Sequence, residues 1–181
     1  MYGIVNKAIE DLVKATFGEE KWNAAKKRSG VKDDYFISSE PYDDAITYQL
    51  AGAISEEMNM PVEEVMISFG EWWVLKTGKE KYGGLMEAGG NSLREFLVNL
   101  HLFHNRVMLI YPKLTPPEFK ISEVESNSVN VHYFSKREGL KDFVKGLLQG
   151  LGKMYNTPVE IVLIKNRNAG DTHEVFNVSW K

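Results

Sequence analysis

The chain has 181 residues, of which 43% are hydrophobic and 26% charged, and its net charge at pH 7 is −3. This length and composition suit one domain with a sizeable core, and the weakly acidic balance disfavours a nucleic-acid partner. Because the chain has no cysteine, disulfides, thiolate nucleophiles, cysteine-ligated zinc and iron–sulfur clusters are excluded. No apolar run approaches the roughly 18 residues of a membrane span, and residues 1–6 lack the order of a signal peptide, so we expect a cytoplasmic protein with no membrane partner.

Helical periodicity dominates the first two-thirds of the chain. Apolar side chains recur at helical spacing there, and Pro61, followed by Glu63 and Glu64, is typical of a helix first turn. The glycine pairs at 83–84 and 89–90 predict chain breaks. The helices predicted before these breaks lie at about residues 5–16, around Trp22 and Ala25, at about 45–58 and at about 61–73.

The best-defined predicted helix covers residues 92–111. It opens with a capping box, in which Ser92 is followed three residues later by Glu95, and it ends before Pro112. His104 lies on the apolar face of this helix. The other residues of that face are Leu93, Phe96, Leu97, Leu100, Val107, Met108 and Tyr111.

The pattern changes from helical to alternating after Thr115-Pro116-Pro117, which forms a stiff joint. Strands separated by turns and one strongly amphipathic helix follow. They are predicted at residues 118–124 and 127–137 (strands), 140–151 (helix), 158–165 and 173–180 (strands). The predicted fold class is therefore α+β, with a helical N-terminal subdomain followed by an antiparallel-sheet subdomain of order β-β-α-β-β.

His104 is the first candidate for chemistry, because burying an imidazole on an apolar face without a partner costs a few kcal/mol. Two arrangements avoid this cost. The ring is hydrogen-bonded to a backbone carbonyl, as in most core histidines, or it ligates haem iron. His101 projects to another side of the helix, and no other histidine cluster completes a zinc site, so His101 is interpreted as a surface residue.

The second candidate is the triplet Tyr133, Ser135 and Arg137, which shares one face of the strand predicted at 127–137. Two hydroxyls and a guanidinium in a row suit a ligand with two carboxylates, since arginine offers a fork that matches carboxylate geometry. The alternative is an ordinary half-exposed strand with polar pairs across the sheet.

Catalytic patterns are missing from the sequence. A chain without cysteine has no thiol catalysis, and there is no Gly-x-Ser-x-Gly elbow for a serine nucleophile. The glycines have no phosphate-loop spacing. We therefore expect a binding protein and not an enzyme.

Taken together, these motifs resemble the haem nitric oxide/oxygen-binding (H-NOX) family, which is related to the haem domain of soluble guanylate cyclase. The resemblance is based on the Tyr-x-Ser-x-Arg motif at 133–137, on His104 upstream in a helix, and on Pro117 between them. The opening Met1-Tyr2-Gly3, Gly139-Leu140 and the glycine-rich segment 146–152 are also typical. The resemblance covers essentially the whole chain and fits a stand-alone bacterial member. Relatives with a cysteine-bound zinc sense thiol oxidation, a mode that a cysteine-free chain excludes.

The resemblance implies a single domain over residues 1–181 that binds haem b (iron protoporphyrin IX) between two subdomains. The distal helical subdomain would span about residues 1–60, and about 61–181 would hold the proximal helix, the sheet and the signalling helix. His104 would be the axial ligand to the iron. Tyr133, Ser135 and Arg137 would bind the propionates, and Pro117 would press on the macrocycle and distort it.

The same resemblance implies which gas is sensed. Relatives that bind O₂ place a tyrosine hydroxyl in the C-terminal helix, at a position that corresponds here to Phe143. The expected distal pocket consists of Val5, Ile9, Trp73, Phe143 and Leu147. This wall is apolar apart from the indole N–H of Trp73, so we expect binding of nitric oxide and CO and poor binding of O₂.

The implied mechanism is release of His104 when NO binds, followed by a shift of the subdomains about the Pro116-Pro117 joint. The output partner would be a histidine kinase, in two-component signalling, or a cyclic-di-GMP enzyme. The alternative is a haem-free small-molecule binding or adaptor domain that uses the same apolar cavity for another acid, such as a fatty acid. Arg137 would then pair with its carboxylate, and His104 would be a core residue. A haem enzyme such as a peroxidase needs a distal acid–base residue, and His132 alternates to the opposite strand face.

Overall fold

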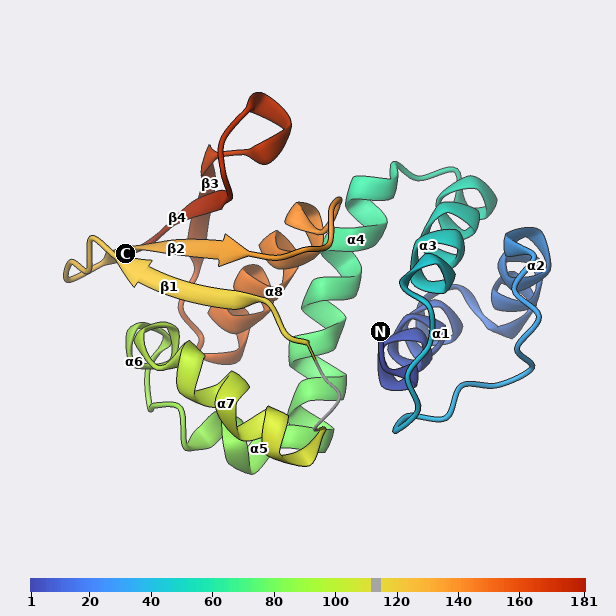
Figure 1. Cartoon of the computed structure of the whole chain (residues 1–181), viewed down its shortest axis with the longest axis horizontal. Coiled ribbons are helices and arrows are strands. Elements are labelled where there is room, and N and C mark those ends of the chain that lie inside the picture. The colour runs from blue at the N-terminus through green and yellow to red at the C-terminus, as the bar shows by residue number, and fades with distance from the viewer. Residues whose placement is uncertain (112–114) are drawn as a thin grey trace.

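The computed structural model of the chain describes residues 1–111 and 115–181, and Figure 1 shows the arrangement of its elements. The helices before the sheet are α1 (Gly3–Phe17), α2 (Glu19–Ser29), α3 (Asp44–Met58), α4 (Val62–Trp72), the π-helical η1 (Trp73–Gly78), α5 (Lys79–Glu87), α6 (Leu93–Val98) and α7 (Leu100–Ile110). They are followed by β1 (Glu118–Ser122), β2 (Ser128–Phe134), α8 (Lys141–Met154), β3 (Val159–Lys165), the 3₁₀ turn η2 (Arg167–Ala169) and β4 (Glu174–Trp180). Within these described ranges no helix is both long and apolar enough to cross a membrane.

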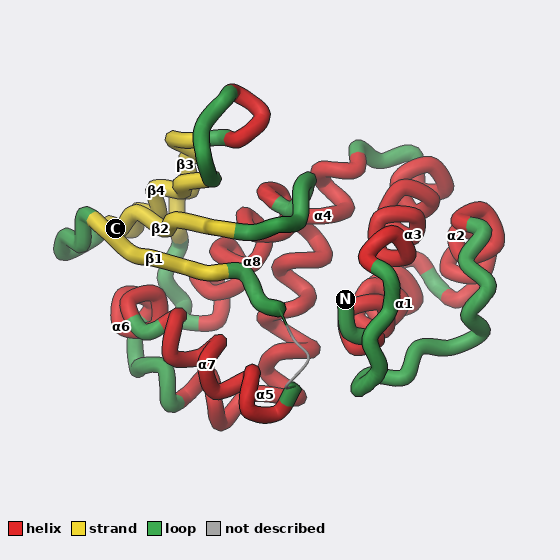
Figure 2. The backbone as a smooth tube through the Cα atoms, in the orientation of Figure 1, coloured by secondary structure: helices red, strands yellow, loops and turns green. Residues whose placement is uncertain are grey.

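The four strands form one antiparallel sheet in the order β1-β2-β4-β3. Strand β2 pairs with β1 on one side and with β4 on the other, while α8 connects β2 to β3 and contacts β3 and β4. Figure 2 shows the strands together on one side of the molecule, and in chain order all four come after α7. The predicted α+β class and the order β-β-α-β-β are therefore confirmed.

Helices α1, α2 and α3 gather on one side of the molecule and the sheet lies on the other, with α4 between them (Figure 1). Helix α8 packs along α4 more closely than any other helix pair among the described residues. A Cβ atom at Gly146 would overlap the carbonyl oxygen of Ile67, and one at Gly70 would overlap that of Phe143. These two glycines let the backbones touch, so the position of α8 relative to α4 is tightly determined.

We therefore predict that Gly146→Ala lowers the free energy of unfolding by roughly 1–3 kcal/mol, because the added methyl meets backbone that cannot rotate away. Gly52→Ala in α3 is the matched control, since no atom lies within 4 Å of the added Cβ. That control should leave stability unchanged or raise it by up to about 1 kcal/mol. Denaturant unfolding of both variants measures the difference, and equal effects would contradict the close contact.

The helix predicted over residues 92–111 is in fact two helices, α6 and α7, so that prediction was wrong in its continuity. The break is at Asn99, whose side-chain amide donates to the carbonyl of Gly89 at 2.9 Å. An asparagine that bonds distant backbone competes with the helical pattern. The capping box is half formed: the Ser92 hydroxyl accepts from the Glu95 amide at 3.2 Å, but the Glu95 carboxylate accepts from the Asn91 amide.

Two other predicted boundaries differ, and a third is not tested. The helix expected to end at Trp73 continues through η1 into α5, and the kink is at Tyr82 (φ −130°, ψ 16°), immediately before the glycine pair 83–84 that was expected to break the chain. The strand expected over 127–137 ends at Phe134, because the following residues turn toward the helical part instead of pairing. The helix stop predicted at Pro112 lies outside the described residues.

Candidate cofactor site

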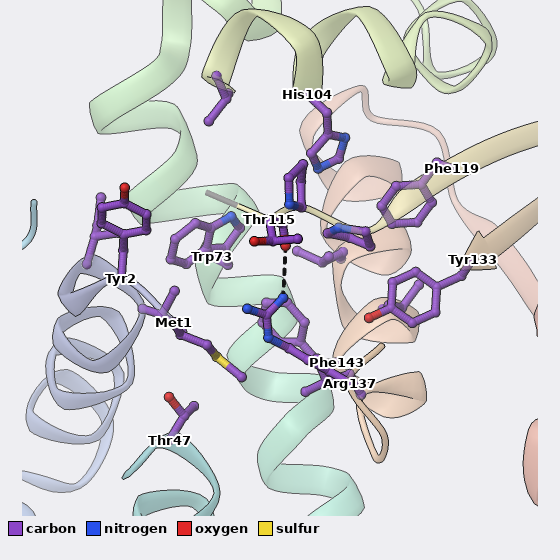
Figure 3. Close-up of a pocket in the computed structure, with 18 of the residues that line it drawn as sticks. Met1, Tyr2, Thr47, Trp73, His104, Thr115, Phe119, Tyr133, Arg137 and Phe143 are labelled. Carbon is purple, nitrogen blue, oxygen red and sulfur yellow. Dashed lines mark hydrogen bonds between the residues drawn. The ribbon is translucent and has the colours of Figure 1, made fainter. Parts of the chain in front are cut away.

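A cavity lies between the helical N-terminal part and the sheet part of the molecule (Figure 3). Its walls come from α1, α3, α4, η1, α5, α7, α8, β1, β2 and the segment 115–117. The space that protein atoms do not fill measures about 1130 Å³, including the open mouth. The lining is predominantly apolar and aromatic.

His104 lies in the wall that α7 contributes, and its ring points into the cavity (Figure 3). Its Nδ1 atom is 3.3 Å from the carbonyl oxygen of Leu100, and its ring stacks on Phe119 with a centroid distance of 5.3 Å. No residue in the described part of the chain hydrogen-bonds to Nε2. Burial lowers the pKa of the imidazole, while the Leu100 carbonyl opposes this shift. The ring is thus neutral near pH 7, with an Nδ1–H donor directed at the carbonyl and an Nε2 lone pair available to a ligand.

This geometry satisfies both interpretations that the sequence left open. The hydrogen bond to Leu100 is the one expected of a core histidine. The same bond fixes the tautomer and the ring orientation that a metal-ligating histidine needs.

The triplet Tyr133, Ser135 and Arg137 does not share a strand face, since β2 ends at Phe134. Tyr133 is the last inward residue of the strand, and the other two follow in a loop in which the Ser135 hydroxyl accepts from the Arg137 amide at 3.0 Å. Burial raises the pKa of the Tyr133 phenol, and a hydrogen bond with Ser135 acts against the rise. Tyr133 and Arg137 line the cavity, whereas Ser135 is not among the lining residues and contacts the Arg137 backbone.

Arg137 spans the cavity mouth. Its Nε donates to Asp44 of α3 at 2.6 Å, and Nη1 donates to the Thr115 carbonyl at 3.0 Å (Figure 3). Asp44 also pairs with the amino group of Met1. Burial acts to raise the pKa of Asp44, but the Met1 ammonium and the guanidinium outweigh it and the pKa is lowered. Arg137 thus already binds a carboxylate here and connects the two sides of the cavity.

The structure brings four of the five expected distal residues to the cavity: Val5, Trp73, Phe143 and Leu147. Ile9 lies elsewhere, because it is one turn further along α1 and fully buried in the core at 0% exposure. The Phe143 ring packs on Phe69 at 4.8 Å. Pro117 lies in the cavity wall beside Pro116, between α7 and β1.

Hydroxyl groups are more numerous in the wall than the sequence indicated. Tyr2, Tyr82 and Tyr111 all line the cavity, with Tyr111 5.0 Å from the Tyr2 ring and 6.3 Å from the Tyr82 ring. Burial and a hydrogen bond with Tyr111 raise the pKa of Tyr82. Tyr111 belonged to the predicted apolar face, but Tyr2 and Tyr82 carried no usable signal, since one precedes its helix and the other lies at a kink.

The residues present fit the group that the resemblance implies. A flat apolar macrocycle with two acidic side arms matches an apolar cavity that has a neutral imidazole in one wall and a tyrosine and an arginine elsewhere in its lining. Among the described residues, no group of three or more His, Cys, Asp or Glu side chains is placed to hold a free metal ion.

Comparison with known proteins agrees with this fit. The family profile described as Haem-NO-binding matches residues 2–163. Soluble guanylate cyclase gcy-31 of Caenorhabditis elegans is 28% identical over 165 residues, which is 91% of this chain and 24% of the cyclase. Soluble guanylate cyclase gcy-33 of the same organism is 25% identical over 99% of this chain and 19% of its own length. The chain spans about a quarter or less of these two relatives.

Solved structures are similar over the whole chain. The H-NOX protein from S. oneidensis in the Fe(II)NO ligation state has a TM-score of 0.89 at 20% identity, covering 100% of this chain and 99% of that one. The Fe(II) unliganded H-NOX protein from K. algicida has a TM-score of 0.86 at 25% identity, covering 100% and 97%. The matched region is a sensor domain and not a catalytic domain.

Proposed function

Because the chain belongs to the haem-NO-binding (H-NOX) family of haem-binding gas sensors, we propose that it binds haem b through His104 and senses nitric oxide. The observation that carries the proposal is the Nε2 of a neutral, part-buried imidazole that faces a wide apolar cavity and has no hydrogen-bond partner among the described residues. The macrocycle would lie between about residues 1–60 and 61–181, the two sides from which the cavity walls come.

The residues of the Tyr-x-Ser-x-Arg motif and Pro117 each have a role in this proposal. Arg137 and the Tyr133 and Ser135 hydroxyls would hold the propionates, since a guanidinium and hydroxyl donors form strong hydrogen bonds to carboxylates. The Asp44–Arg137 ion pair supports this task, because it uses only part of the guanidinium. Pro117 would contact the macrocycle from the wall and bend it.

Selectivity for nitric oxide is supported by the α8 wall. Phe143 and Leu147 line the cavity without a hydrogen-bond donor, and Val5 adds none from α1. Ferrous haem supplies an iron atom that binds NO and CO without a donor, whereas bound O₂ depends on one. We therefore infer binding of NO and CO and poor retention of O₂.

Signal output would depend on His104 leaving the iron when NO binds. His104 is on α7, which is followed by residues 115–117 and then β1. Release of His104 from the iron would therefore allow α7 and residues 115–117 to move. Arg137 links the same segment to α3 through Thr115 and Asp44, which couples the change to the helical side. A ligand shifts such an equilibrium only by its differential affinity for the two states. We propose a histidine kinase or a cyclic-di-GMP enzyme as the partner in the cytoplasm.

The absorbance spectrum of the purified ferrous protein tests the proposal. We expect a coloured protein with five-coordinate histidyl haem that is unchanged in air-saturated buffer and becomes a five-coordinate nitrosyl with NO. A spectrum that changes in air to a stable six-coordinate form would contradict the NO selectivity. A colourless protein that does not take up added haem would overturn the haem assignment and favour a haem-free acid-binding domain built on Arg137.

A further inference from the structure

Arg167 lies in the η2 turn between β3 and β4, and all three nitrogens of its guanidinium have partners. Its Nη1 donates to the carbonyl of Ser135 at 2.8 Å and its Nη2 to the carbonyl of Arg137 at 3.0 Å. Its Nε donates to both carboxylate oxygens of Glu174, at 2.9 and 2.8 Å. One side chain from a distant turn therefore holds the backbone on both sides of Lys136, within the Tyr-x-Ser-x-Arg motif.

Glu174 fixes the direction of this guanidinium. Its side chain is only 5% exposed, while that of Arg167 is 22% exposed. Glu174 is the first residue of β4 and is paired in register with Tyr133, the motif's first member. The η2 turn is itself held by Asn166, whose side chain accepts from the Asn168 amide at 3.0 Å. Because this ion pair is largely buried and its arginine lies in a hydrogen-bonded turn, its geometry is better defined than that of most surface pairs.

The loop after β2 is held from the opposite side by α3. The Tyr48 hydroxyl donates to the Glu138 carbonyl at 2.8 Å, and Asp44 accepts from the Arg137 side chain. Arg167 thus attaches the backbone of the loop to the sheet side. The guanidinium of Arg137 contacts Asp44 and the Thr115 carbonyl instead. Arg167 itself does not line the cavity.

We propose that Arg167, oriented by Glu174, is a positioning residue that sets the carboxylate-binding loop so that Ser135 and Arg137 meet the acidic side arms of the cofactor. The inference rests on the proposed function, because it assumes that this loop binds the haem propionates. It goes beyond that function, since Arg167 lies outside the motif and acts on backbone carbonyls rather than on the ligand. Losing these contacts should weaken recognition of the carboxylates and leave the apolar contacts of the macrocycle unchanged.

The experiment compares iron protoporphyrin IX with its dimethyl ester, which keeps the macrocycle but has no carboxylates. Dissociation rates of both from the reconstituted protein are measured by transfer to excess apomyoglobin. In the unaltered protein the ester should dissociate faster by on the order of ten- to a hundredfold. In Arg167→Met the ratio of the two dissociation rates, ester over iron protoporphyrin IX, should fall by about tenfold. A merely structural role would speed the loss of both cofactors equally and leave the ratio unchanged, and that result would overturn the proposal.

Two further variants sharpen the comparison. Arg167→Lys keeps a charge beside Glu174 but cannot reach both carbonyls, so the ratio should stay reduced, and full recovery with lysine would contradict positioning by the guanidinium. Arg94→Met is the matched control, because Arg94 also donates to a backbone carbonyl, that of Glu125 at 3.0 Å, away from the cavity. Its ratio should match that of the unaltered protein.

The outcomes separate the inference from the function beneath it. If the unaltered protein binds haem but does not distinguish the ester, the propionate assignment fails, and the inference fails with it. If it distinguishes the ester and Arg167→Met does so equally, only the inference fails. Should Arg167→Met not fold, Glu174→Gln removes the charge that orients the guanidinium, and its ratio should fall in the same direction by a smaller factor.

Discussion

Replacing His104 with glycine is expected to increase the rate of haem loss at least a hundredfold, which corresponds to about 2.7 kcal/mol. In the described part of the chain, His104 is the only histidine that lines the cavity, so its removal leaves the iron without a protein nitrogen ligand. Free imidazole should enter the space left by the side chain and slow the loss again. Transfer of haem to excess apomyoglobin, with and without imidazole, measures both effects.

His101→Gly is the matched control for this prediction. His101 lies one turn earlier on the same helix, α7, and is exposed to solvent. The substitution places the same helix-weakening residue in α7 without touching the cavity, so haem loss should remain close to that of the unaltered protein. If His104→Gly retained haem as well as His101→Gly did, His104 would not be the ligand.

Much of the fold could be predicted because it follows from short-range patterns. Helical spacing placed α1, α3, α4 and α8, and alternation of apolar residues placed the strands, since each element buries one face. The placement of His104 on a buried face followed from the same periodicity. Its orientation toward a cavity did not, because a period describes which face is buried and not what lies opposite.

What the sequence did not predict depends on contacts between residues far apart in the chain. The break at Asn99 requires the Gly89 carbonyl, and the Asp44–Arg137 ion pair joins residues 93 positions apart. Arg167 reaches a loop some 30 residues earlier. In the sequence alone, polar side chains such as these cannot be distinguished from ordinary surface residues, because their hydrogen-bond partners are known only from the fold. The expected strand face at Ser135 and Arg137 failed for the same reason, since the loop is shaped by α3 and η2 rather than by strand pairing.

The α8 wall carries the second large prediction, which is that Phe143→Tyr gives measurable O₂ retention to a protein that we expect to retain O₂ poorly. Phe143 lines the cavity, and the contact between α8 and α4 at Gly146 and Gly70 fixes the helix that carries it. A hydroxyl added there would donate to bound dioxygen, which develops partial negative charge. Such a bond contributes about 1.5–3 kcal/mol, so O₂ dissociation should slow on the order of ten- to a hundredfold.

Phe103→Tyr is the control that makes this result specific. Phe103 also lines the cavity, but it is on α7 beside His104, with the two ring centroids 5.6 Å apart. A hydroxyl on that side should not reach a gas bound opposite His104, so O₂ dissociation measured by stopped flow should change in Phe143→Tyr alone, while NO binding stays strong in both variants. An equal change in both would mean that cavity polarity, and not a directed bond, governs retention. Slow O₂ dissociation in the unaltered protein would instead point to a donor already in the cavity wall, either the indole N–H of Trp73 or the hydroxyl of Tyr2, Tyr82 or Tyr111.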